Sequence, residues 1–310
     1  MCNDRGISLR RGLAAASPAA DLSNDPHRWG SADSFEITFP GLPLLVQNLQ
    51  SCPEIRLWES QTVWFRGVID EVETAWGTAC ITTVCGRGLA AKLMDNQASG
   101  AEFYQADLNT VLDRYVRPFG ITDIYAPGSY RARLWSVGAG VSSFRVLQGF
   151  CRLAGAPQPR FSREGTLMIA PGGTGYSIGA SELLSAKLRL CRYGVISRQL
   201  VADLSSGSVR TADLNCAAQY GISSRHVATR SGPLTHVTEI SARQRLEDST
   251  KELYTLELVL PHVQKIQCCD SVTVYLSDLG ASGDYIVTET CREFDGSRET
   301  TCLRLRRKEL

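Results

Sequence analysis

The spacing of hydrophobic and polar positions changes near Gly86. Residues 63–70 place successive side chains on two different faces, which is typical of a β-strand with at least one buried side. Residues 78–85 form a second run rich in Thr, Val and Ile, and Trp76-Gly77 lies between the two runs as a turn. The pattern therefore predicts a β-hairpin that ends where the spacing changes.

Beyond the hairpin the spacing becomes helical, and a short helix is predicted to begin near Leu89. Asp107 can cap the N-terminus of the next helix, and Pro118 and Gly120 would end it. This helix carries one apolar stripe at helical spacing, formed by Leu108, Val111, Leu112, Tyr115 and Val116. Such a stripe needs a surface to pack on, so the helix must lie against another part of the fold.

Helical and extended segments alternate as far as residue 170. A further helix is predicted from a Ser142 or Ser143 cap to Gly155, and a turn at 163–165 leads into a strand over 166–170. The sequence therefore predicts α/β organisation for this part of the chain.

Alternating runs lie on both sides of the α/β region. Short turns separate them, which is the signature of an antiparallel barrel or sandwich. The Asp295-Gly296 pair is a strong hairpin signal near the end of the chain. The runs cover residues 34–39, 54–58, 253–260, 271–276, 284–291 and 300–306. The fold class is predicted to be α+β, mainly β.

Two other stretches give weaker patterns. Ile7, Leu9 and Leu13 could form a first strand, but residues 14–33 are rich in Ala, Ser, Pro and Asp and are predicted to be a loop. Residues 212–215 repeat the tetrapeptide of residues 106–109, which predicts the start of another short helix through the same N-cap chemistry.

Several motifs occur in a characteristic order. They are F-x-G-x-I-D from Phe65 to Asp70, V-x-G-R-G-L-A-A-K-L-M-D from Val84 to Asp95, R-P-F-G-I from Arg117 to Ile121, and a glycine-rich closing segment over 279–287. In order and spacing they resemble the baseplate hub proteins of contractile phage tails, including those of Mu-like phages, the late control protein D family and prophage tail-like particles. These motifs mark a fold and contain no catalytic centre.

The resemblance implies two tail-tube-like antiparallel β-barrels with an α/β insert. Residues 1–88 would form the N-terminal part of the first barrel, 89–175 the insert, and 176–310 a connecting segment and the second barrel. It further implies a homotrimer that acts as a pseudo-hexameric adaptor between the tail tube protein and a central spike protein, next to other baseplate proteins. DNA would only pass through, and the chain would assemble in the host cytoplasm before joining the virion or tail-like particle.

Composition narrows the function classes. A chain of 310 residues that is 43% hydrophobic can bury one large core or two ordinary ones. A net charge of +1 with mixed signs excludes a free-standing nucleic-acid binder, and no apolar run is long enough for membrane insertion. Arg304 and Arg306 belong to the one basic cluster of the sequence and are predicted to share the face of a solvated edge strand.

The cysteines do not form a recognisable framework. There are 11 of them, an odd number with irregular spacing and no C-x-x-C pair. We therefore expect reduced, mostly buried thiols in a cytosolic protein, without disulfides or a zinc site.

No catalytic, cofactor-binding or metal-binding residues are predicted. The four histidines form no H-E-x-x-H motif, and there is no G-x-S-x-G motif. Glu71 and Glu73 share a strand face that Asp70 does not, and Pro171–Gly175 lacks the lysine of a phosphate loop and reads as a plain turn. Arg87 is either a turn residue that caps carbonyls, the favoured reading, or part of an ion pair between subunits.

Two alternatives remain. A tail-associated glycan-binding or peptidoglycan-hydrolysing protein would need clustered carboxylates or aromatic side chains, which the tryptophans could supply, although Trp58 and Trp64 are predicted to be core residues. The hub of a type VI or extracellular injection system would share the fold. The five tryptophans are Trp29, Trp58, Trp64, Trp76 and Trp135.

Overall fold

The computed structural model describes residues 33–40, 49, 53–59, 62–173, 175–204, 207–230, 235–262, 264–294 and 299–308. The predicted first strand, the loop up to residue 32 and the Asp295-Gly296 turn lie outside these residues. The described chain is built mainly from β-sheets with few helices, which confirms the α+β, mainly β class.

Strands β1 to β4 form an antiparallel four-stranded sheet, the N-terminal sheet, in the order β1-β4-β3-β2. Its strands β3 and β4 are the predicted hairpin. One face buries the side chains of a separate core that includes Phe35, Ile37, Leu57 and Phe65. The strands are β1 (Ser34–Pro40), β2 (Glu54–Glu59), β3 (Thr62–Trp76) and β4 (Cys80–Gly88).

The insert follows β4 and contains helices α2, α3 and α4 around a core of its own. Asp107 caps α3 by accepting a hydrogen bond from the Thr110 amide at 2.8 Å, and Ser142 caps α4 through the Arg145 amide. Both predicted helices are therefore confirmed with their caps. The elements are α2 (Ala91–Met94), β5 (Ala101–Asp107), α3 (Leu108–Tyr115), η1 (Arg117–Phe119), β6 (Ile124–Tyr125), β7 (Arg131–Val137), α4 (Ser143–Leu153), β8 (Arg160–Phe161) and β9 (Leu167–Met168).

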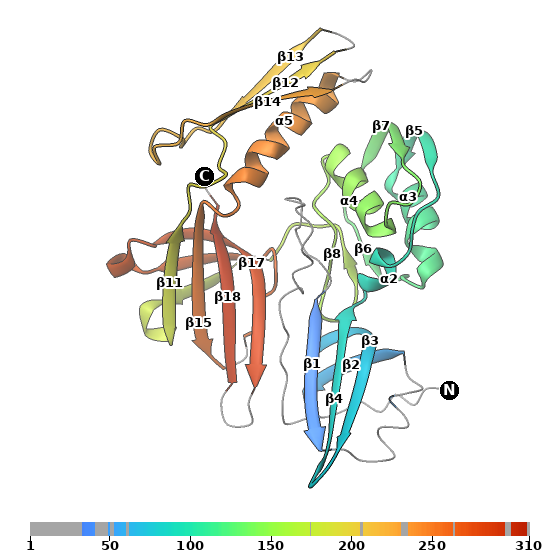
Figure 1. Ribbon diagram of the computed structural model, residues 1–310, viewed down its shortest axis with the longest axis vertical. Coiled ribbons are helices and arrows are strands. Elements are labelled where there is room, and N and C mark those ends of the chain that lie inside the picture. The colour runs from blue at the N-terminus through green and yellow to red at the C-terminus, as the bar shows by residue number, and fades with distance from the viewer. Residues whose placement is uncertain are drawn as a thin grey trace.

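The C-terminal sheet has six strands in the order β10-β16-β17-β18-β15-β11 and lies beside the N-terminal sheet (Figure 1). Arg304 and Arg306 do share a face, but their strand lies between β15 and β17, so the predicted edge position is wrong. The elements are β10 (Tyr176–Gly179), η2 (Ala180–Glu182), β11 (Ser185–Leu190), β15 (Tyr254–Pro261), β16 (Ser271–Tyr275), η3 (Ser277–Leu279), β17 (Gly283–Phe294) and β18 (Glu299–Arg307).

The segment between β11 and β15 folds into an outer layer, in which helix α5 packs on a three-stranded sheet of order β13-β12-β14. The helix predicted at residues 212–215 is wrong, because Asp213 instead ends a strand and forms an ion pair with Arg198 on the neighbouring strand. The elements are β12 (Arg198–Asp203), β13 (Val209–Asp213), β14 (Arg225–Arg230) and α5 (Thr235–Thr250).

The two large sheets repeat one design. Four strands of the C-terminal sheet, β15-β18-β17-β16, follow the same antiparallel order as β1-β4-β3-β2. The third strand of each carries a bulge at the matching place, between Ile69 and Glu71 in one and between Val287 and Glu289 in the other. Within the described residues no pairing joins the two end strands of either sheet, so each is an open sheet there.

The connection from the insert to the C-terminal sheet includes residues 171–175, for which the sequence predicts a turn and of which Thr174 lies outside the described residues. Its Gly173 amide donates a hydrogen bond to the Asp270 carboxylate at 2.8 Å, so this backbone group is occupied within the chain. Gly172 passes so close to the opposite loop that a Cβ atom would lie 1.7 Å from the Cys269 carbonyl oxygen. Only glycine, which has no Cβ atom, allows the two segments to lie this close together.

Replacing Gly172 with alanine should therefore force the two segments apart and lower the free energy of unfolding by about 2 kcal/mol or more. Gly149 is a matched control, because it lies within α4 and an added Cβ would meet nothing within 4 Å. Gly149→Ala should stabilise the protein by about 0.5–1 kcal/mol. Urea unfolding of both variants measures the difference, and equal midpoints would contradict the close approach.

Candidate interaction surfaces

The N-terminal sheet, the insert and the C-terminal sheet meet at the side chain of Trp64 on β3. The guanidinium carbons of Arg163, from the insert, and of Arg292, from β17, each lie 5.5 Å from the centre of its ring. Arg292 is only 7% exposed and donates hydrogen bonds to the carbonyls of Gln264 and Ile266. Trp64 is half-buried at this junction and is not part of the core of its own sheet, so the prediction that it is a core residue is wrong.

Arg87 lies at a second junction, between the N-terminal sheet and the insert. Its guanidinium donates paired hydrogen bonds of 2.8–2.9 Å to the carboxylates of Asp70, in the bulge of β3, and Asp95, at the end of α2. The reading of Arg87 as a turn residue that caps carbonyls is therefore wrong. The Arg87 guanidinium pairs within the chain.

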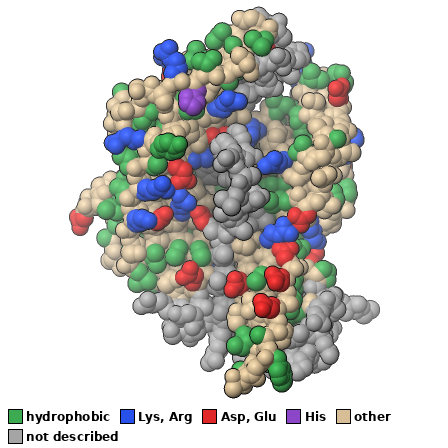
Figure 2. Space-filling view, in the orientation of Figure 1, with side chains coloured by type: hydrophobic (Ala, Val, Ile, Leu, Met, Phe, Trp, Pro, Cys, Tyr) green, Lys and Arg blue, Asp and Glu red, His purple; other side chains and the backbone are tan. Residues whose placement is uncertain are grey.

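The outer face of the N-terminal sheet is acidic. Glu36 and Glu71 lie on either side of Cys85, and Glu73 follows on the same face, as the alternation predicted. Burial raises the pKa of the Cys85 thiol, and the three carboxylates raise it further, which places them close together. Figure 2 shows Asp and Glu side chains gathered over this part of the molecule.

The far end of the β3–β4 hairpin is apolar. Trp76 is 85% exposed, and Ile81, on the same face as the carboxylates, is 46% exposed. The hairpin end projects at the bottom of Figure 1, away from the insert. The strand register places Trp76 on the opposite face of the hairpin from Ile81 and the carboxylates, so the hairpin end offers an apolar side chain on each face and acidic groups on one. The name hairpin surface is used below for both faces of this end: Trp76 on one, and Ile81 with the Glu36, Glu71 and Glu73 carboxylates on the other.

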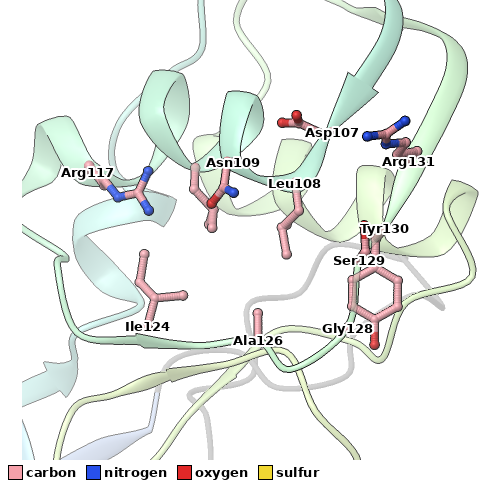
Figure 3. A pocket seen from close by; sticks show the side chains of 11 residues that line it. Asp107, Leu108, Asn109, Arg117, Ile124, Ala126, Gly128, Ser129, Tyr130 and Arg131 are labelled. Atoms are coloured by element: carbon pink, nitrogen blue, oxygen red, sulfur yellow. The ribbon is translucent and has the colours of Figure 1, made fainter.

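A polar cavity of about 380 Å³ lies in the insert, between the start of α3, η1 and the loop before β7 (Figure 3). Its charged groups lie close to partners. Asp107 caps α3, and hydrogen bonds from the Thr110 amide and hydroxyl lower its pKa, as does the charge of Arg131, which lies opposite Asp107 on the neighbouring strand. Arg117 forms an ion pair with Asp113. The residues that line the cavity include no histidine, cysteine or glutamate. The lining offers the hydroxyls of Ser129 and Tyr130, and its one carboxylate, Asp107, already accepts the hydrogen bonds that cap α3.

In the part of the chain that the structure describes, no three His, Cys, Asp or Glu side chains could hold a metal ion. All nine described cysteines are free thiols, but only Cys151 is buried and the others are half-buried, so the prediction of mostly buried thiols is wrong. Among the described helices, none is both long enough and apolar enough to cross a membrane.

Comparison with known proteins gives matches at the level of structure. No family model matches the chain, and no curated protein matches it. The 43 kDa tail protein of prophage MuSo2 from Shewanella oneidensis matches with a TM-score of 0.74 at 14% identity, over 96% of this chain and 93% of its own. A tail protein from Neisseria meningitidis MC58 gives the same score and identity over 96% and 92%. The chain has the fold of these tail proteins.

A more distant match extends over the whole chain as well. A chain of the Francisella PdpA-VgrG complex, in its lidded form, has a TM-score of 0.53 at 8% identity, over 97% of this chain and 49% of that chain. The sequence motifs that resembled hub proteins thus led to the right fold. None of the surfaces described above could have been found from those motifs, because each surface depends on which strands become neighbours.

Two tryptophans allow a direct comparison of the junction with the hairpin surface. Trp64→Ala should lower the free energy of unfolding by about 2–3 kcal/mol, because it removes a half-buried ring and both cation–π contacts. Trp76→Ala should change it by less than about 0.5 kcal/mol, because that ring is exposed. Chemical denaturation followed by circular dichroism measures both values. Equal losses of the free energy of unfolding at the two positions would contradict the stabilising role of Trp64 at the junction.

Proposed function

We propose that the protein is a structural subunit of a phage tail or tail-like particle and forms the hub of its baseplate. The observation that carries this proposal is the repeated sheet: β1–β4 and β15–β18 share strand order, strand direction and the position of a bulge. One chain therefore supplies two similar building blocks. The similarity to two prophage or bacterial tail proteins over nearly the full length of each supports the assignment.

The repeat suggests a mechanism for joining parts of different symmetry. Three copies around a threefold axis present six similar sheets, so the ring is nearly sixfold on one side and threefold on the other. Such a homotrimer can adapt a sixfold tail tube to a threefold central spike. The two sheets lie side by side in the chain, as successive segments of one ring require (Figure 1).

The hairpin surface is our candidate for a contact with a neighbouring tail component, either the tube or the spike. A partner that encloses the hairpin end would offer an apolar pocket to the exposed Trp76 on one face. On the other face it would contact Ile81 and offer lysine or arginine side chains to the carboxylates. In this proposal DNA only passes through the ring, and the chain is non-enzymatic, assembles in the host cytoplasm and ends in the particle. The division at residues 1–88, 89–175 and 176–310 belongs to the same proposal.

A second candidate is the hub of a type VI or extracellular injection system, which the similarity to the Francisella PdpA-VgrG complex favours. A glycan-binding role has less support. Trp135 stacks on Phe103 inside the insert, Trp64 lies at the junction and Trp76 is at the end of the hairpin, so these three tryptophans do not form one aromatic surface.

The hub proposal predicts a trimer. Light scattering after size exclusion should give three times the chain mass of 33.9 kDa, and negative-stain images should show a ring with six similar lobes. The spike protein of the same particle should be added if the isolated protein is a monomer, because assembly on the spike is compatible with the proposal. A chain that stays monomeric with its spike present would overturn it.

The hairpin surface predicts a loss of partner binding without a loss of the trimer. Trp76→Ala, or Glu71→Lys combined with Glu73→Lys, should weaken binding of the neighbouring tube or spike protein by about 10- to 100-fold, the effect of removing a dominant interface residue. Tyr193→Ala is the control, because Tyr193 is 93% exposed but lies between β11 and β12. Unchanged binding of both partners would exclude the hairpin as the contact.

A further inference from the structure

Cys291 on β17 and Cys302 on β18 lie directly opposite each other in the C-terminal sheet. Opposed residues of antiparallel strands have Cα atoms roughly 4.5–5.5 Å apart. A disulfide bond requires a Cα separation of about 4.4–6.8 Å. The strand pairing therefore holds these two thiols at a separation that allows a covalent bond without movement of the backbone.

The environment of the two thiols leaves them accessible. Both are half-buried, and they project from the face opposite to the buried side chains of Leu303 and Leu305. No other strand pairing in the described residues places two cysteines opposite each other; Cys85, for example, faces Glu36 and Glu71. Cys151 is completely buried and out of reach of a reagent.

We propose that Cys291 and Cys302 form a modification site, a dithiol that a low-molecular-weight disulfide converts into a covalent link between β17 and β18. One thiolate attacks a sulfur of the reagent, so the S–S bond of the reagent breaks, a mixed disulfide forms and one thiol leaves. The second thiolate then displaces the other half of the reagent. Two protein thiols are oxidised, and one reagent disulfide is reduced to two thiols. This inference stands independently of the proposed function.

The groups around the two thiols determine the rate of the reaction. Burial raises the pKa of the Cys291 thiol to about 11, and the carboxylates of Glu293 and Glu289 contribute to the increase. Burial and the charge of Glu293 also raise the pKa of the Cys302 thiol. Because the thiolate is the reacting form, the rate should rise by about tenfold per pH unit between pH 7 and 10.

The link would join the two strands that form the longest pairing of the C-terminal sheet. It would close a short loop of chain and so restrict the unfolded state more than the folded one. We expect the melting temperature of the oxidised protein to rise by about 5 °C.

The test treats the folded, reduced protein with oxidised glutathione at pH 8, blocks remaining thiols with iodoacetamide and maps the linked peptides by mass spectrometry. The proposal expects a Cys291–Cys302 link within one chain, together with the higher melting temperature. Cys291→Ser and Cys302→Ser should each stop at a stable glutathione adduct on the remaining thiol. Cys80→Ser is the matched control and should leave the link unchanged.

Two outcomes would overturn the proposal. One is a protein that stays folded by circular dichroism and gains no Cys291–Cys302 link over the pH range 7–10. The other is a link that forms only after unfolding in urea, because the native strand pairing would then not be what brings the thiols together.

Discussion

The arrangement of the whole chain depends on the contact between the Trp64 ring and two arginines. Burying Arg292 costs free energy, and burial together with the nearby Arg163 lowers its pKa. The cost is offset by hydrogen bonds to the carbonyls of Gln264 and Ile266, by the face of the ring and by the charge of Asp33. These groups come from both large sheets, and Arg163 comes from the insert. The contact is therefore satisfied only when all three are in place.

A related arrangement ties each sheet to a helix. Arg87 on β4 and Arg306 on β18 occupy matching positions of the repeated sheets. Each arginine directly follows the residue that pairs with the last residue before the bulge of the neighbouring strand, β3 or β17. Arg87 binds Asp95 at the end of α2, and Arg306 lies close to Glu247 and Asp248 on α5. The same strand position thus serves two different helical neighbours. This correspondence supports the view that one design was used twice within the chain.

Most local patterns were read correctly from the sequence, with the helix predicted at residues 212–215 as an exception, and long-range contacts were not. The β3–β4 hairpin and the Asp107 cap depend on residues close together in the chain. Helix α5 was missed because most of its residues are polar; Ala242, Leu246 and Thr250, four residues apart and buried, were the available signal. The roles of Trp64 and Arg87 depend on partners that only the complete fold brings near. The repeat could not be recognised in the sequence, because the two bulges lie at the same position of their sheets but have different residues around them.

A ring of six similar sheets requires that the two sheets of each chain keep a fixed relation, and differential scanning calorimetry tests this most directly. If the Trp64 junction joins the chain into one body, the protein should melt in a single transition whose calorimetric and van't Hoff enthalpies agree. Two separate transitions, one for each large sheet, would contradict the account. The sheets would then be independent units, and their side-by-side placement could not define a ring.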